Sequence, residues 1–104
     1  MSSQDLTAIK EVETSDPELK KPNYYQLILL NDDYTPMDFV VHLLQKFFSF
    51  SPEKSTKIMM QIHVEGKGSC GVYTKEIAET RKSQINEYAK QHKYILKSEI
   101  EKVD

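Results

Sequence analysis

Three polar residues, Asn31, Asp32 and Asp33, stand together directly after the apolar run at residues 27–30. Two carboxylates beside a carboxamide at such a position serve either as turn residues or as part of a binding site. Asn and Asp are favoured in turns because their side chains hydrogen-bond to the nearby backbone. Taken locally, the pattern favours a turn and leaves a binding site as the alternative.

Adjacent acids also occur in metal sites and in acid–base catalysis. The side chains of Asp32 and Asp33 diverge if the turn is extended, and a metal needs further ligands that converge on one point. The histidines His42, His63 and His92 do not have the spacing of a zinc site. The sequence has no Gly-rich phosphate loop and no familiar Ser or Cys nucleophile motif. A small metal-dependent hydrolase that uses Asp32, Asp33 and His63 is therefore only the alternative function, and no metal or other cofactor is expected.

Single residues elsewhere are weaker signals. His63 stands one turn after Met59 and Met60, near the end of an otherwise apolar helix pattern. A lone histidine there is by default a partly buried side chain with its hydrogen bond satisfied, and methionines usually fill core. Cys70 is the single cysteine, which excludes an internal disulfide, and we expect it to be a small buried hydrophobe in a strand.

Length and composition limit the class of protein. A chain of 104 residues, 38% of them hydrophobic and 29% charged, supports one domain with a modest core. No apolar run approaches the ~20 residues that span a bilayer, and residues 1–22 lack the apolar segment of a secretory signal. We therefore expect a cytoplasmic protein. The net charge of −2 and the scattered Lys and Arg residues argue against nucleic-acid binding.

Composition changes along the chain. Residues 1–22 are polar and mixed in charge, so we expect a disordered N-terminal tail, followed by a folded domain at residues 23–104. The aromatic and branched-aliphatic residues 24–30 predict a central strand.

A helix is expected at residues 36–48. Thr35 can cap it, Pro36 suits its first position, and Asp38 stands where the acid of a capping box belongs. The helix carries apolar residues around most of its surface, which predicts that most of it is buried.

Further capping, glycine and alternation signals predict the rest of the fold. They indicate a helix at residues 52–64 capped by Ser51 and ended by Gly66, a strand at residues 70–74, a helix at residues 75–91 capped by Thr74, and a last strand at residues 94–100. The order β-α-α-β-α-β predicts an α+β fold, in which a small three-stranded antiparallel sheet packs with three helices.

Three segments resemble one family together. "NDDYTPMDFVVHLLQKFF", "IMMQIHVEGKGSCGVYT" and "KEIAETR" are similar to the ClpS adaptor family of bacterial N-end-rule proteolysis, in the same order and spacing. The resemblance extends from Tyr24 to about Glu101. It implies an adaptor rather than an enzyme. Such an adaptor binds N-terminal Phe, Leu, Tyr or Trp of substrate proteins and delivers them to the ClpA unfoldase of the ClpAP protease.

The resemblance also implies roles for individual residues in recognising the N-terminal residue. The ligands of the α-amino group match Asn31, Asp32 and His63, and the methionine that screens pocket entry matches Met37. The side-chain pocket matches Thr35, Met37, Val40, Met59, Ile62 and Leu96. The position matching Ile62 is often Val in relatives.

Partner binding is assigned in the same way. The surface that docks on the ClpA N-terminal domain matches Glu76 and Arg81, the latter being a lysine in some relatives. The tail at residues 1–22 matches the segment needed for substrate delivery. A monomer suffices for this function. A third hypothesis is a structural or ribosome-associated interaction domain without a ligand pocket.

Overall fold

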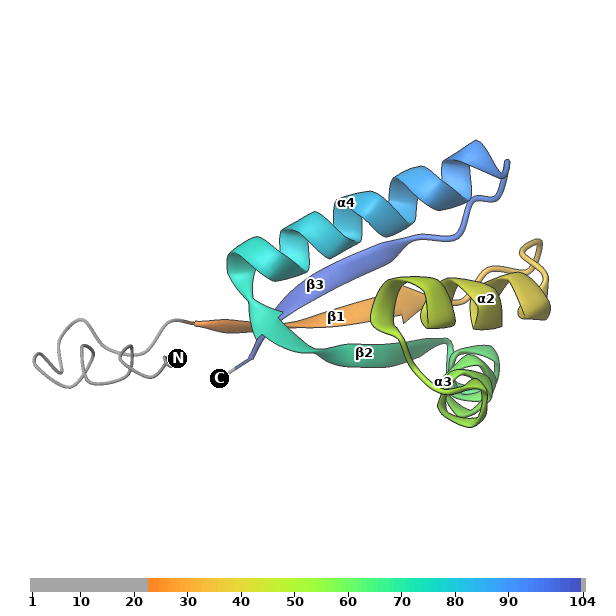
Figure 1. Ribbon diagram of the computed structural model, residues 1–104, viewed down its shortest axis with the longest axis horizontal. Helices are drawn as coiled ribbons and strands as arrows, with labels where there is room; N and C mark the ends of the chain where they lie inside the picture. The colour runs from red at the N-terminus through yellow and green to blue at the C-terminus, as the bar shows by residue number, and fades with distance from the viewer. Residues whose placement is uncertain (1–22, 104) are drawn as a thin grey trace, which may run out of the picture.

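The computed structural model describes residues 23–103, which contain three strands and three helices in the predicted order (Figure 1). The expected tail at residues 1–22 lies outside the described residues. The elements are β1 (Tyr24–Leu30), α2 (Met37–Phe48), α3 (Pro52–Glu65), β2 (Lys67–Thr74), α4 (Lys75–Gln91) and β3 (Ser98–Val103).

Strand β1 lies in the middle of the sheet, whose order is β2-β1-β3. Both neighbours run antiparallel to β1, which confirms the predicted fold class. Leu27 and Leu29 of β1 are fully buried, as expected for a central strand, and each contributes roughly 1.5–3 kcal/mol through burial. In Figure 1, α4 lies along the sheet, whereas α2 and α3 gather at the end of the sheet where β1 stops.

The predicted helix starts are only partly correct. Ser51 caps α3 as expected, because its Oγ accepts a hydrogen bond of 3.1 Å from the Lys54 amide. The N-cap of α2 is Pro36, which makes no side-chain cap bond, so the predicted cap at Thr35 and the capping box with Asp38 are wrong. Thr74 occupies the N-cap position of α4, but its side chain makes no cap hydrogen bond.

The last strand begins later than the alternating pattern predicted. Residues 94–97 are irregular and β3 begins at Ser98. Lys97 still accepts a hydrogen bond from the Leu30 amide, but β1 ends at Leu30, so residues 94–96 have no strand opposite them. The alternation in burial still holds: Leu96 and Ser98 are buried, whereas Ile95 is exposed. At the other sheet edge, β2 begins at Lys67, three residues before the predicted start.

The surface of α3 is less buried than its apolar residues suggested. Ile58, Met59 and Ile62 are buried, but Met60 is half-exposed and Val64 is 73% exposed. Cys70 is buried as predicted, and burial raises the pKa of its thiol to about 12. Within residues 23–103, no helix is long and apolar enough to cross a membrane.

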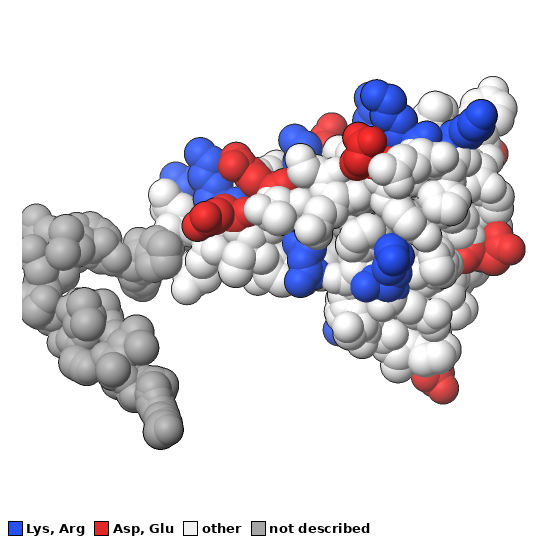
Figure 2. All heavy atoms as spheres, turned by 45° about the horizontal axis from the view of Figure 1, so that its top comes forward, with Lys and Arg blue, Asp and Glu red and all other residues white. Residues whose placement is uncertain are grey.

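Figure 2 shows charged side chains of both signs on one face of the described domain. On the face shown in Figure 2, acidic and basic residues lie close to one another, and a broad area between them is uncharged. That face therefore presents no extended patch of one sign.

Helix α3 ends at Gly66, as the sequence predicted. Gly66 has φ +93° in the left-handed region, and its amide donates a hydrogen bond of 2.9 Å to the Ile62 carbonyl. A Cβ at this position would meet open space, so the backbone conformation alone favours glycine.

Replacement of Gly66 by alanine is expected to lower the free energy of unfolding by about 1 kcal/mol, because an L-residue is strained in this conformation. Gly66→Asn is the matched control, since asparagine tolerates left-handed backbone better than alanine does. Urea unfolding of the three proteins checks this. Equal stability of the alanine and asparagine variants would contradict the conformational explanation.

Candidate functional site

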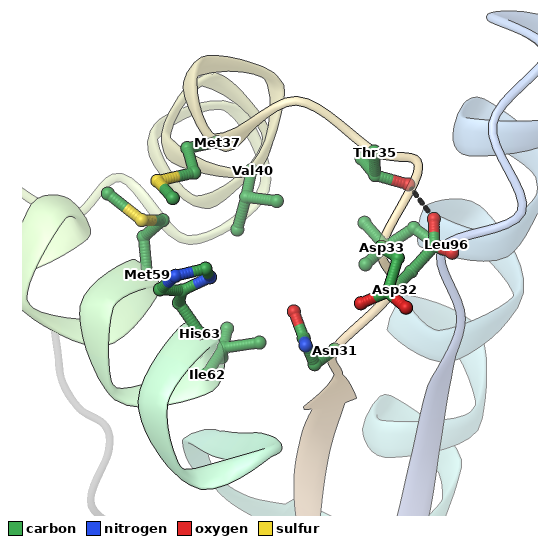
Figure 3. Close-up of a pocket in the computed structure, with 10 residues that line it drawn as sticks. All are labelled: Asn31, Asp32, Asp33, Thr35, Met37, Val40, Met59, Ile62, His63 and Leu96. Atoms are coloured by element: carbon green, nitrogen blue, oxygen red, sulfur yellow. Dashed lines mark hydrogen bonds between the residues drawn. The ribbon is translucent and has the colours of Figure 1, made fainter.

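One pocket gathers residues from four separate segments of the chain (Figure 3). Its volume is about 140 Å³. The lining residues are Asn31, Asp32, Asp33, Thr35, Met37, Val40, Met59, Ile62, His63 and Leu96. Every residue that the resemblance assigned to recognition of an N-terminal residue is among them, together with Asp33. The structure thus places these side chains around one hollow, while their roles in binding remain predictions.

Each segment reaches the pocket from the end of a regular element. The turn after β1 supplies Asn31 to Thr35, and the first turns of α2 supply Met37 and Val40. The last two turns of α3 supply Met59, Ile62 and His63, and the irregular segment before β3 supplies Leu96. A helix places residues three or four apart on one side, which explains why Met59, Ile62 and His63 face the same hollow.

Two backbone hydrogen bonds hold these segments together at the end of β1. The Leu30 amide donates to the Lys97 carbonyl at 3.0 Å, next to Leu96. The Asn31 amide donates to the Gly66 carbonyl at 2.9 Å, at the end of the helix that carries His63. These two neighbouring hydrogen bonds at the end of β1 therefore bring Asn31, His63 and Leu96, which are far apart in the sequence, close together in space.

Asp32 is oriented by its own turn. The Thr35 hydroxyl donates a hydrogen bond to Oδ2 of the Asp32 carboxylate, drawn as a dashed line in Figure 3. This bond uses the hydroxyl that was expected to cap α2. Because a carboxylate accepts several hydrogen bonds, the remaining capacity of Asp32 is free for a ligand.

The pocket is polar on one part of its wall and apolar on the rest. Asn31 and His63 are exposed and Asp32 is partly buried, so these polar groups can be reached from solvent. Behind them, the apolar lining is almost completely buried. It consists of Val40, Met59, Ile62 and Leu96. Met37 differs from these apolar residues because it is 45% exposed.

The alternative function, a metal-dependent hydrolase, would need a ligand set for a metal. Asp32, Asp33 and His63 all line the pocket, but no group of three or more His, Cys, Asp or Glu side chains in residues 23–103 is arranged to hold a metal ion. The described part of the chain therefore gives the hydrolase hypothesis no metal centre.

Glu76 and Arg81 lie on α4 and do not line the pocket. Glu76 is exposed in the first turn of the helix. Arg81 is partly buried: its guanidinium donates a hydrogen bond to the Phe47 carbonyl at the end of α2 and lies 5.7 Å from the centre of the Phe48 ring. Arg81 therefore joins two helices within the domain, a role that the sequence analysis missed.

Two further features of the pocket escaped the sequence analysis. Asp33 was not among the residues that the resemblance assigned to recognition of an N-terminal residue, although it also lines the pocket. The hydrogen bond between Thr35 and Asp32 was also missed, although both residue types commonly use their side chains for hydrogen bonds in turns. Both features depend on the path of the turn rather than on residue type.

Comparison with known proteins identifies relatives over nearly the whole described region. The profile of the family "ATP-dependent Clp protease adaptor protein ClpS" matches residues 20–99. The ATP-dependent Clp protease adapter protein ClpS of Hydrogenovibrio crunogenus is 48% identical over 92 residues, which cover 88% of each chain. ClpS of Xanthomonas campestris pv. campestris is 51% identical over 85 residues, covering 82% of this chain and 80% of that one.

A solved structure is similar as well. Agrobacterium tumefaciens ClpS2, determined bound to L-phenylalaninamide, matches with a TM-score of 0.78 and 32% sequence identity. The match covers 80% of this chain and 100% of that one. The similarity therefore includes the elements that build the pocket.

Proposed function

Because this chain belongs to the ClpS family of ATP-dependent Clp protease adaptor proteins, we propose that it binds the N-terminal residue of substrate proteins and delivers them to the ClpA unfoldase of ClpAP. The preferred N-terminal residues are Phe, Leu, Tyr and Trp. The single observation that carries the proposal is the pocket that combines Asn31, Asp32 and His63 with a buried apolar lining.

The polar groups suit a free α-amino group. An α-ammonium has three N–H donors and one positive charge. The side-chain carbonyl of Asn31, the carboxylate of Asp32 and an unprotonated ring nitrogen of His63 supply three acceptors, one of them charged. Charge-assisted hydrogen bonds contribute about 1.5–3 kcal/mol each. An internal peptide amide offers one donor and no charge, so it leaves acceptors unpaired and is disfavoured.

The apolar lining suits the side chain of the N-terminal residue. The whole pocket, including the space beside its polar groups, has a volume of about 140 Å³, close to the ~150 Å³ cavity that accommodates benzene in another protein, so a group of the size of a phenyl ring is a suitable occupant. Burial of a Leu or Phe side chain contributes roughly 1.5–3 kcal/mol. The half-exposed Met37 lies where it can contact the entering residue, and a β-branched Ile or Val, stiff at its first torsion, is rejected there.

The similar ClpS2 of A. tumefaciens supports this assignment. Its ligand, L-phenylalaninamide, combines a free α-amino group with a phenyl side chain. These are the two groups that the polar and apolar parts of the present pocket suit. We propose the same class of ligand for this chain, with no cofactor and no catalytic step.

We assign docking on the ClpA N-terminal domain to Glu76 and Arg81. Both lie on α4, outside the pocket, so a substrate can occupy the pocket while α4 contacts ClpA. Glu76 makes no salt bridge with a described residue, which leaves its carboxylate available to a basic partner group. Arg81 contributes both through its charge and through its bond to the Phe47 carbonyl.

Substitution of Asp32 by asparagine is expected to weaken binding of a Phe-initiated peptide at least ~10-fold, because the charged acceptor is lost. Asp38→Asn is the matched control, since Asp38 is an exposed acid in the first turn of α2 and does not line the pocket. Titration calorimetry with Phe-initiated, N-acetylated and Ile-initiated peptides measures the effect. The wild-type protein should bind only the first peptide.

Equal affinity for the acetylated peptide would rule out recognition of a chain end. Metal-dependent turnover of a substrate would instead support the hydrolase, and absence of any peptide binding would favour a structural interaction domain.

Charge reversal by Glu76→Lys is expected to weaken binding to the isolated ClpA N-terminal domain, while peptide affinity and stability stay unchanged. Arg81→Ala should weaken the same binding and also lower the free energy of unfolding by on the order of 1 kcal/mol, because it removes the bond to the Phe47 carbonyl. Glu87→Lys, exposed farther along α4, is the control. Undiminished ClpA binding by Glu76→Lys would contradict the assigned docking surface.

A further inference from the structure

Strand β2 approaches α3 unusually closely at Gly68, beside the pocket. Gly68 is buried and pairs with Leu29 of the central strand. A Cβ placed on Gly68 would lie 2.7 Å from Cγ1 of Ile62 and 3.5 Å from its Cδ1. Ile62 itself is only 2% exposed and lines the pocket. The Ile62 side chain therefore fills the space that a side chain at position 68 would need.

Ile62 cannot yield freely to such a side chain. Cγ1 is bonded directly to Cβ, so it moves only if χ1 changes or if the helix moves. In a helix, isoleucine has one strongly preferred χ1 rotamer. The Ile58 carbonyl oxygen, one turn earlier, would lie 3.5 Å from the added Cβ, so the helix backbone is also close to the strand.

Either response would change the pocket. Rotation of Ile62 away from β2 moves its carbons out of the space beside the strand and changes the lining that the residue provides. Displacement of α3 instead moves Met59, Ile62 and His63 together, and these residues form one side of the pocket. A methyl group added to Gly68 of β2 would thus change the shape of the pocket through Ile62 or through α3, although Gly68 does not line the pocket.

We propose that Gly68 is a positioning residue that determines how large an N-terminal side chain the pocket accepts. This proposal rests on the proposed binding of N-terminal residues and extends it to a residue that does not line the pocket. By lacking a side chain, Gly68 allows Ile62 to lie against the sheet and keeps the pocket deep enough for aromatic residues. The depth of the pocket depends on two residues together, because the absence of a side chain at Gly68 on β2 sets where the Ile62 side chain on α3 can lie.

The test compares affinities of Phe-initiated and Leu-initiated peptides for four proteins: wild type, Gly68→Ala, Ile62→Val and the double variant. Gly68→Ala should weaken binding of the Phe peptide on the order of 10-fold, and of the Leu peptide no more than about 3-fold. Valine lacks Cδ1, so a side chain pushed away from β2 carries one carbon fewer into the pocket. The double variant should therefore restore the Phe-to-Leu affinity ratio to within about 2-fold of wild type.

Val72→Ala is the control, because Val72 is half-exposed on the same strand and does not line the pocket. Its affinity ratio should equal that of wild type. An unchanged ratio in Gly68→Ala would overturn the inference while leaving the proposed function intact. Recovery in the double variant supports the inference through rotation of Ile62, and a changed ratio without recovery supports it through displacement of α3, because valine keeps a γ carbon beside β2. If Gly68→Ala does not fold, the double variant and Ile62→Val provide the test. Ile62→Val should raise the Phe-to-Leu affinity ratio. An unchanged ratio in Ile62→Val would overturn the inference. Wild-type protein that binds neither peptide would overturn the proposed function instead.

Discussion

The end of strand β1 is the point on which the candidate site depends. Two consecutive amides, Leu30 and Asn31, donate to the Lys97 and Gly66 carbonyls and so join the segment before β3 and the end of α3 to one strand end. These bonds pair both backbone donors within the domain and connect the two neighbouring segments to the end of β1. The turn that carries the polar residues consequently begins at a strand end that is hydrogen-bonded on both sides.

This arrangement divides recognition between two kinds of interaction. In the proposed function, the polar groups at the rim select for charge and for the number of donors, which distinguishes a chain end from an internal amide. In the same proposal, the buried lining selects for size and shape, and the close approach of α3 to β2 at Gly68 sets its dimensions. Asp32 and Ile62 illustrate the division, because the turn orients one through Thr35 and the sheet positions the other through Gly68.

Much of the fold was predictable because it depends on local patterns. The central strand β1, the cap at Ser51 and the helix end at Gly66 follow from burial, capping and backbone preference. Thr35 was mispredicted because its hydroxyl had two possible partners, a helix amide and the Asp32 carboxylate, and the path of the turn decided between them. Residues 94–97 alternate like a strand, but β1 ends at Leu30, opposite Lys97, so residues 94–96 have no strand to pair with. The pocket is lined by residues that are far apart in the sequence, so only the resemblance to a family could predict which residues line it.

The most direct measurement is a titration of the isotopically labelled protein with L-phenylalaninamide, followed by NMR of the backbone amides. The proposed recognition of a free α-amino group and its side chain predicts saturable shifts centred on Asn31, Asp32, His63 and Leu96. N-acetyl-phenylalaninamide at the same concentrations should leave these signals in place. Equal shifts with the acetylated compound, or shifts centred away from the pocket, would contradict the claim that this site reads the beginning of a protein chain.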